Sequence, residues 1–422
     1  MSNRIAPSVR LEEEIGDLLE TGITDEEKLT EIGRLGARLV LQRGVDEEVE
    51  SFLGRARYER SSDARGSRNG HRPRRVQTAE GEITVAMPQV RDSAERFVSA
   101  VIPHARRVIR TEPLKALVIG SYVRGLSDRD IQSLAEEAGL GAISKSTVSR
   151  VCQELRSRYR AFCARDLSEV ELVALFLDGV YLRTRPQGEK EAVLVAWGYT
   201  IAGDRELVAV RLGQRESHDD WRDLGRDLTR RGLRAPWLTV VDGAPGLNRA
   251  ITELWPEADR QRCTVHRLRN IMAKLPRRDE ALRERVHAAY WEALDEATAV
   301  EDGEQRLRSL VNELEVDYPS AAACLADDLE ALCVHLKYPL RLRKRLRSSN
   351  LLERSLEEVQ RRAKVIGRFP GETSCLSLSW AVMDLVIRAG HGLGLTELDR
   401  QHLDRLRTAD EPDDPAELSE TA

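Results

Sequence analysis

The sequence lacks the long apolar stretch that a membrane-spanning protein needs. No run of about 18 or more apolar residues, the length of a transmembrane helix, occurs anywhere in the 422 residues. The first twenty residues, MSNRIAPSVRLEEEIGDLLE, also lack the apolar centre of a secretory signal peptide. We therefore expect a cytoplasmic protein with no membrane partner.

Cysteine is sparse and scattered. The six cysteines stand far apart in a long chain, which excludes the disulfide framework of a small secreted domain. A paired zinc pattern of the form CxxC…CxxC is absent. Only Cys263 and His266 have the spacing of metal ligands, and Cys333 with His335 is a weaker candidate for the other half of a site.

The chain as a whole has no excess of positive charge. Its formal net charge of −5 argues by itself against a nucleic-acid partner. The charges are segregated, however: acidic residues concentrate in 12–50 and 410–420, and basic residues in 55–75, 104–110 and 337–368. Attraction to phosphate is local and is screened over about 10 Å, so the basic segments remain compatible with DNA binding.

At 422 residues the chain is too long for one small domain, and an apolar fraction of 41% is enough for sizeable cores. We expect an α/β protein in which one α/β domain is interrupted by an all-α insertion and preceded by helical segments. The expected divisions are 1–54 (helical), 55–111 (basic arm and short β segment), 112–166 (helix-turn-helix), 167–276 (first part of the α/β domain), 277–347 (α-helical insertion), 348–407 (second part of the α/β domain) and 408–422 (acidic, disordered tail).

The basic segment 55–75 cannot build a core, because it is polar, contains glycine and is heavily cationic. It is either a plain linker or an arm that becomes ordered on phosphate, and we favour the arm. The alternating stretch 81–88 that follows predicts a short strand. The candidate DNA contacts in the arm are Arg68, Asn69, Arg72, Arg74 and Arg75.

Helical periodicity dominates from 112 to 160. One helix is predicted over 113–122, and Ser127 is a suitable N-cap for a second over 128–138. A third begins at the stretch SKSTVSR, capped by Ser144 or Ser146. This arrangement resembles a helix-turn-helix, although three-helix units without a DNA function are common. The residues expected to meet DNA are Lys145, Ser146, Thr147 and Arg150.

From about residue 167 the pattern changes to alternating strands and helices. The first three predicted strands are joined by short polar turns and should form an antiparallel meander, and the fourth follows a helix and can lie parallel beside the first. That order is the order of a ribonuclease-H-like sheet. The predicted elements are strands 172–182, 192–200, 206–212 and 238–242, with a helix over 219–231.

Two aspartates occupy unusual places in these strands. Asp178 is the only polar residue in the apolar run 172–178, and an ionised group there is costly unless a cation compensates it. Asp242 ends the apolar strand of PWLTVVDG. Asp-Gly is also a common turn dipeptide, so each aspartate taken alone has a structural explanation.

A third carboxylate, Glu353, lies in a charged helix predicted over 351–364. With Asp178 and Asp242 it would supply the hard oxygen ligands that magnesium or manganese prefers, and two such ions can support phosphodiester chemistry. On the residues alone, Glu353 could be one more surface ion pair, and Glu357 or Glu358 would be nearly as good a ligand.

Four separated motifs resemble the Mutator-type transposases of bacterial insertion sequences: FLDGVYLR, VVDGAPGLNRAI, DRQRCTVHRLRNIMAKLP and SSNLLERSLEEVQRRAKVIGRFPGETSCLSL. The likeness covers roughly residues 58–387. It implies that the family's aspartate-aspartate-glutamate triad falls on Asp178, Asp242 and Glu353. The family's Cys-x-x-His signature falls on Cys263 and His266, and a packing and positioning role is favoured over a zinc half-site or a cysteine nucleophile.

The resemblance implies a DNA transposase that binds the terminal inverted repeats of its element, cleaves DNA and joins it to a target. Two magnesium or manganese ions per active site, DNA and a dimer or larger assembly are the implied cofactors and partners, and zinc is not expected. The alternatives are a non-catalytic helix-turn-helix regulator and a repair nuclease. Cations that could hold DNA beside the metals, or merely form a solvated face, are Arg343, Lys344, Arg361 and Arg362.

Overall fold

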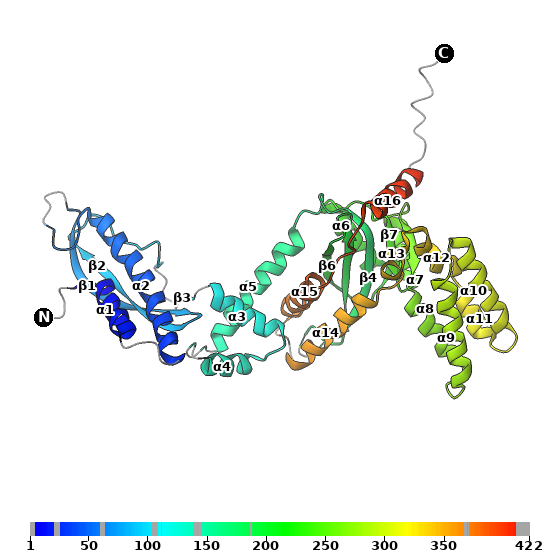
Figure 1. The fold of residues 1–422 in the computed structure, drawn as a ribbon, viewed down its shortest axis with the longest axis horizontal. Coiled ribbons are helices and arrows are strands. Elements are labelled where there is room, and N and C mark those ends of the chain that lie inside the picture. The colour runs from blue at the N-terminus through cyan, green and yellow to red at the C-terminus, as the bar shows by residue number, and fades with distance from the viewer. Residues whose placement is uncertain are drawn as a thin grey trace, which may run out of the picture. The chain divides into compact units, whose positions relative to one another are not determined.

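The chain divides into two compact units, Met1–Glu154 and Leu155–Ala422 (Figure 1). In the computed structural model the described residues are 5–20, 26–59, 64–102, 109–110, 112–138, 140, 143, 145–185, 188–366, 369 and 371–410.

The first unit opens with two helices packed on each other, and the second of them lies on a β-hairpin. Val45 of the second helix is buried with Val76, Ile83 and Val85 of the hairpin. The elements are helices α1 (Pro7–Glu20) and α2 (Glu26–Leu53), and strands β1 (Ser67–Thr78), β2 (Gly81–Arg91) and β3 (Ile109–Arg110), with β1 antiparallel to β2 and parallel to β3.

The prediction that residues 55–75 form a linker or a phosphate-ordered arm is wrong for its second half, which is part of β1. The reason lies downstream: Val76 is buried against the core and pairs with Ile83, so the basic residues before it are drawn into the same ladder. Arg72 pairs with Met87 and Arg75 with Thr84 along the hairpin.

Three helices follow: α3 (Glu112–Val123), α4 (Asp128–Glu137) and α5 (Lys145–Ala164). The predicted cap at Ser127 is confirmed as a complete capping box: its side chain accepts from the Asp130 backbone N–H at 3.3 Å, and the Asp130 carboxylate accepts from the Ser127 N–H at 2.9 Å. Ser144, one of the two caps predicted for the third helix, lies outside the described residues.

A five-stranded sheet forms the centre of the second unit, in the order β6-β5-β4-β7-β8. The first three strands along the chain form the predicted antiparallel meander, and the fourth lies parallel beside the first as expected. The bounds are β4 (Leu172–Leu182), β5 (Glu191–Thr200), β6 (Arg205–Gly213), β7 (Leu238–Val241) and β8 (Asp259–Arg262).

Helices cover both faces of this sheet, which explains the continuously apolar strands. On one face, Leu175 and Leu177 of β4 pack with helices α6 (His218–Arg230) and α7 (Pro245–Leu254). Because side chains alternate along a strand, Asp178 belongs to the opposite face with Phe176. Helix α14 (Asn350–Ile366) packs against β4 and α15 (Glu372–Arg388) against β6.

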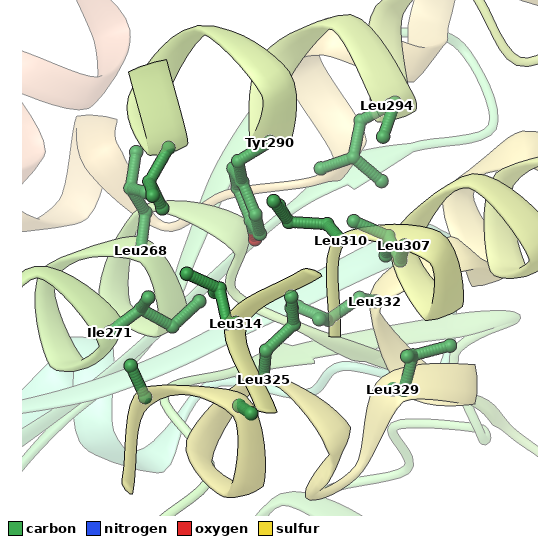
Figure 2. Close-up of a cluster of buried hydrophobic side chains, with 14 of the residues drawn as sticks. Leu268, Ile271, Tyr290, Leu294, Leu307, Leu310, Leu314, Leu325, Leu329 and Leu332 are labelled. Carbon is green, nitrogen blue, oxygen red and sulfur yellow. The ribbon is translucent and has the colours of Figure 1, made fainter. Parts of the chain in front are cut away.

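Between β8 and α14 the chain is helical, as predicted for residues 277–336. Figure 2 shows the core that these helices share, in which Leu268, Tyr290, Leu307 and Leu332 converge from four of them. The helices are α8 (Thr264–Lys274), α9 (Glu280–Asp295), α10 (Val300–Glu315), α11 (Pro319–Ala326), α12 (Leu329–Cys333), the 3-10 turn η1 (Val334–Lys337) and α13 (Leu340–Leu346).

The last two helices that the structure describes, which belong to the second unit, follow α14. Helix α15 buries Leu378, Val382 and Met383, which confirms the packed helix predicted over 376–387, and α16 (Glu397–Asp410) follows it. Among the helices that the structure describes, none has the length and apolar content to cross a membrane.

The helical core between β8 and α14 should be sensitive to cavities. Leu307 is fully buried in it, so we expect Leu307→Ala to lower the free energy of unfolding of this region by about 2–5 kcal/mol. Val316, in contrast, is 86% exposed, and Val316→Ala is the matched control. Guanidinium unfolding of the full chain measures both variants, and equal midpoints would contradict the assigned core.

Candidate active site

Asp178 and Asp242 stand at the same level of neighbouring parallel strands. Phe176 of β4 is in register with Val240 of β7, and each aspartate lies two residues further along its own strand. Each carboxylate accepts one nearby backbone hydrogen bond at 2.8 Å, Asp178 from the Gly179 N–H and Asp242 from the Ala244 N–H. The sheet therefore presents two neighbouring carboxylates, Asp242 just after the last residue of β7 and Asp178 at the same level within the longer β4.

The pair is electrostatically unfavourable as it stands. Burial, with a smaller contribution from the charges of Asp242 and Glu353, raises the pKa of Asp178 to about 7 against the opposing effects of the Gly179 hydrogen bond and His266. Within the described part of the chain, neither aspartate forms an ion pair. Two adjacent carboxylates without a paired cation repel one another, and a bound cation would remove that repulsion.

Glu353 comes to the same face of the sheet from the first turn of α14. Its carboxylate lies 2.7 Å from the His266 Nε2 and 2.6 Å from a guanidinium nitrogen of Arg269, both on α8. Its side chain is only 14% exposed, so it is not a solvated surface charge. Glu358, an alternative on the residues alone, is held instead by Arg361 and Arg362, whose hydrogen bonds lower its pKa to about 2.

The Cys263–His266 signature connects β7, α8 and α14. The buried Cys263 donates its backbone N–H to Val241 at 2.7 Å, and its sulfur accepts from the Ser349 N–H and hydroxyl at 3.4 Å. The Ser349 hydroxyl also lies 3.5 Å from the His266 Nδ1. Ser349 directly precedes the helix that carries Glu353, so this contact fixes where that helix begins.

The charge state of this signature follows from its partners. Burial opposes the charged imidazolium of His266, but the Cys263 hydrogen bond and the charges of Cys263, Glu353 and Asp178 outweigh it and raise the pKa to about 9. For Cys263, burial likewise opposes the thiolate, and the hydrogen bond and charge of His266 overcome it and lower the pKa. His266 is therefore cationic at neutral pH and compensates Glu353.

The donor chemistry of the three carboxylates fits a hard divalent cation, because all three offer only oxygen. In their present arrangement the three carboxylates do not form a complete metal site, because in the described part of the chain no three histidine, cysteine, aspartate or glutamate side chains are grouped closely enough to hold a metal ion. The contacts of Glu353 account for this, since its carboxylate is turned to His266 and Arg269. Ion binding would require Glu353 to turn toward the two aspartates.

A glycine follows each aspartate, and charged side chains approach both glycines closely. A β-carbon at Gly179 would meet the Glu216 carboxylate and one at Gly243 the Arg262 guanidinium, but both groups are the ends of flexible side chains and can move. Gly243 also has a φ of +84°, a left-handed conformation that favours glycine. Glu216 itself has a φ of 54°, and burial together with the charge of Asp242 raises its pKa.

Two charged neighbours of the three carboxylates, Glu216 and Arg269, were not predicted from the sequence. Arg269 could have been found, because it follows His266 by three positions on one helix and therefore shares its face. No signal pointed to Glu216, since it reaches the site only through the packing of β6 and α6.

In the first unit the candidate DNA contacts fall into three groups. Arg68 donates to the Ala56 and Arg55 carbonyls and lies 3.5 Å from Glu50, so it is engaged in the fold. On β1, Asn69, Arg72 and Arg75 are exposed and Arg74 is half-buried, with Arg75 3.6 Å from Glu82. On α5, Arg150 is half-buried, and the side chains of Lys145, Ser146 and Thr147 lie outside the described residues.

In the second unit the candidate cations are largely paired within the chain. Arg343 donates to the backbone carbonyls of Tyr338, Ala297 and Thr298, and burial lowers its pKa. Arg361 is 63% exposed and Arg362 is mostly buried, both bound to Glu358. Lys344 is 73% exposed and lies 3.8 Å from Asp295.

Comparison with known proteins gives a consistent result. Residues 15–386 match the family described as "Transposase, Mutator family". The chain is 34% identical over 345 residues to the transposase for insertion sequence element ISRM5 of Rhizobium meliloti (strain 1021), covering 81% of this chain and 84% of that protein. It is 36% identical to the transposase for insertion sequence element IS6120 of Mycolicibacterium smegmatis, covering 62% of this chain and 81% of that protein. It is 29% identical to the transposase for insertion sequence element IS256 in transposon Tn4001 of Staphylococcus aureus, covering 88% of this chain and 93% of that protein. The chain therefore belongs to the Mutator family of transposases.

Proposed function

We propose that this transposase cleaves DNA at the ends of its insertion sequence and joins the freed 3′ ends to target DNA, with Asp178, Asp242 and Glu353 as its catalytic carboxylates. The observation that supports this assignment is the register of β4 with β7, which sets Asp178 level with Asp242, together with the packing of α14 on the same strand. Transposition requires DNA cleavage and strand transfer, and membership of the family supports both activities.

The proposal includes a ribonuclease-H-like catalytic domain made of residues 167–276 and 348–407, with 277–347 as its insertion. Three antiparallel strands followed by two parallel strands, with helices on both faces, support this assignment. The insertion begins after α8 and ends before α14, and the hydrogen bonds of Ser349 to Cys263 join the start of α8 to the start of α14. Residues 408–422 form the acidic tail of the proposed division.

The residues present fit a pair of magnesium or manganese ions held by Asp178, Asp242 and Glu353. When bound, such ions polarise the phosphate and lower the pKa of an attacking water or 3′-hydroxyl. Because the pKa of Asp178 is raised to about 7, its carboxyl is partly protonated near neutral pH and must lose that proton to bind an ion. His266 and Arg269 hold Glu353 in the ion-free state, and when Glu353 turns to the ions they would leave positive charge beside the position of the scissile phosphate.

The proposed contacts to the terminal inverted repeats lie in the first unit. The exposed Asn69, Arg72 and Arg75 would bind phosphates, and α5 would act as the recognition helix of a helix-turn-helix through Lys145, Ser146, Thr147 and Arg150. The capping box at Ser127, which fixes the start of the preceding helix, supports this arrangement. Two element ends must be joined, so the working form is a dimer or larger.

Substitution of the triad tests the catalytic assignment. Asp178→Asn, Asp242→Asn and Glu353→Gln should each lower metal-dependent cleavage and strand transfer of a labelled terminal DNA at least about a hundredfold, because each removes a charged oxygen ligand. Binding of the same DNA should be unchanged. Glu357→Gln, on the exposed part of the same helix, is the matched control and should retain activity.

Three other outcomes would lead to different conclusions. Loss of activity in Glu357→Gln but not in Glu353→Gln would identify Glu357, one helical turn further along α14, as the third ligand. Binding without cleavage in the unmodified protein would identify a regulator, and cleavage without joining would identify a nuclease.

The raised pKa of Asp178 predicts how the stability of the metal-free protein depends on pH. A carboxyl whose folded-state pKa is about 7 stabilises the fold while protonated, and this contribution is lost as the pH rises from near 4 through 7. Asp178→Asn cannot ionise, so its melting temperature relative to the unmodified protein should rise by several degrees between pH 5 and pH 8. Magnesium at pH 8 should then stabilise the unmodified protein more than the variant, and a difference that is independent of pH would contradict the buried, unpaired state of Asp178.

Exposed cations of the hairpin should contribute to end binding through phosphate. Arg72→Ala and Arg75→Ala should each weaken binding of terminal DNA and reduce the slope of log affinity against log salt by about one. Arg34→Ala is the control, because Arg34 is exposed on α2 and pairs with Glu31 at 2.7 Å. Titrations of fluorescent DNA at several salt concentrations measure the slope, and equal slopes for all three variants would exclude the hairpin from the DNA interface.

A further inference from the structure

A groove of about 830 Å³ lies between α8 and α9, beside the residue that holds Glu353. Arg269, which binds the Glu353 carboxylate, forms one end of its lining together with Asn350 at the start of α14. The volume falls within the range of about 300–1,000 Å³ that is typical of pockets for small ligands, so it can hold a nucleotide. The groove is not lined by any of the three proposed catalytic carboxylates.

The groove combines an apolar floor with an aromatic wall. Leu268 and Met272 line it from α8, and Trp291 and His287 line it from α9. The indole is held in a fixed position, since its N–H donates to the His287 Nε2 at 3.3 Å and the Arg347 guanidinium lies 4.5 Å from its ring centroid. The preceding residue, Tyr290, is anchored in the helical core of Figure 2 and donates its hydroxyl to the Thr264 carbonyl at 2.9 Å.

The charged part of the lining is cationic. Arg269, Arg277 and Arg283 all contribute to it, and no aspartate or glutamate of the described chain does. Arg283 also donates to the Met272 carbonyl at 2.6 Å, which joins α9 to α8 across the groove. Arg277 is exposed and makes no hydrogen bond or ion pair with the described residues. A surface of this kind attracts phosphate and offers it several guanidinium donors.

From these features we infer that the groove binds an unpaired nucleotide of the DNA strand next to the scissile phosphate. This inference rests on the proposed function only for the position of that phosphate. The base would lie on the apolar floor against Trp291, and its phosphate would meet Arg269 and Arg277. Single-stranded nucleic acid is bound in this way elsewhere, by aromatic stacking within a positively charged groove.

The apolar floor distinguishes an unpaired nucleotide from intact duplex. A duplex presents phosphates and sugars at its surface and keeps the faces of its bases stacked on one another, so it would satisfy the arginines and leave the exposed parts of Met272 and Trp291 uncovered. An unpaired base offers both an apolar face and an adjacent phosphate, which matches the two halves of the groove. Its binding would also separate the strands where cleavage takes place.

A binding experiment without catalysis tests this inference. Full-length protein in EDTA is titrated with two terminal DNAs of one sequence, one fully paired and one with about three unpaired nucleotides at the element end, one of them 2-aminopurine. We expect the unpaired probe to bind about tenfold more tightly, with quenched 2-aminopurine fluorescence on stacking. Trp291→Ala should abolish both effects, and Trp291→Phe should retain most of each.

Two further variants exclude trivial explanations. Met272→Glu places a negative charge on the floor without removing the indole, and it should also abolish the preference for the unpaired probe. Trp237→Ala removes a half-buried tryptophan that lines a different cavity, and it should have no effect on the preference. Melting temperatures establish that each variant is folded.

Retention of the preference in both Trp291→Ala and Met272→Glu would overturn the inference. Equal weakening of the two probes by these variants would overturn it too, since it would indicate contact with duplex alone. Failure of the catalytic proposal gives a different result: Glu353→Gln would still cut DNA, whereas the binding preference measured in EDTA would be unaffected.

Discussion

The second unit is organised around two carboxylates that the sheet forces together. Asp178 lies within β4 and Asp242 directly follows the parallel strand β7 at the same level, and the apolar residues before them fix their register through burial on both faces. A one-residue slip of either strand would move its aspartate to the other face of the sheet. The position of the pair is therefore set by hydrophobic packing, at an electrostatic cost shown by the raised pKa of Asp178.

Contacts among three residues bring the third carboxylate, Glu353, close to the two aspartates. Cys263, His266 and Ser349 form a continuous contact between the end of β8 and the start of α14, although the last lies more than 80 residues beyond the first. The helical insertion between them has its own core, so it can be long without disturbing the point where the chain returns to the sheet. Glu353 is thus positioned by the signature residues, and His266 supplies it with a cationic partner within the protein.

Much of this arrangement was accessible from the sequence because it depends on strong local patterns. Apolar strands joined by short turns predicted the meander and the parallel fourth strand, and Ser127 predicted the start of a helix. Resemblance to a family, rather than spacing, distinguished Glu353 from Glu357 and Glu358. The prediction for residues 55–75 was wrong from residue 67 onward because the composition is that of a disordered segment, whereas Val76 and the partner strand determine the conformation of residues 67–75. Glu216 and the groove beside Trp291 could not be predicted from the sequence, since both depend on how distant elements pack.

The claim on which the catalytic role depends is that the carboxylates of Asp178, Asp242 and Glu353 bind common metal ions. Anomalous diffraction from crystals grown with manganese measures this directly. The expected result is manganese within about 2.0–2.3 Å of oxygens from both aspartates, with the Glu353 carboxylate turned from Arg269 toward the ion. Manganese at other positions only, with Glu353 still bound to His266 and Arg269, would contradict it.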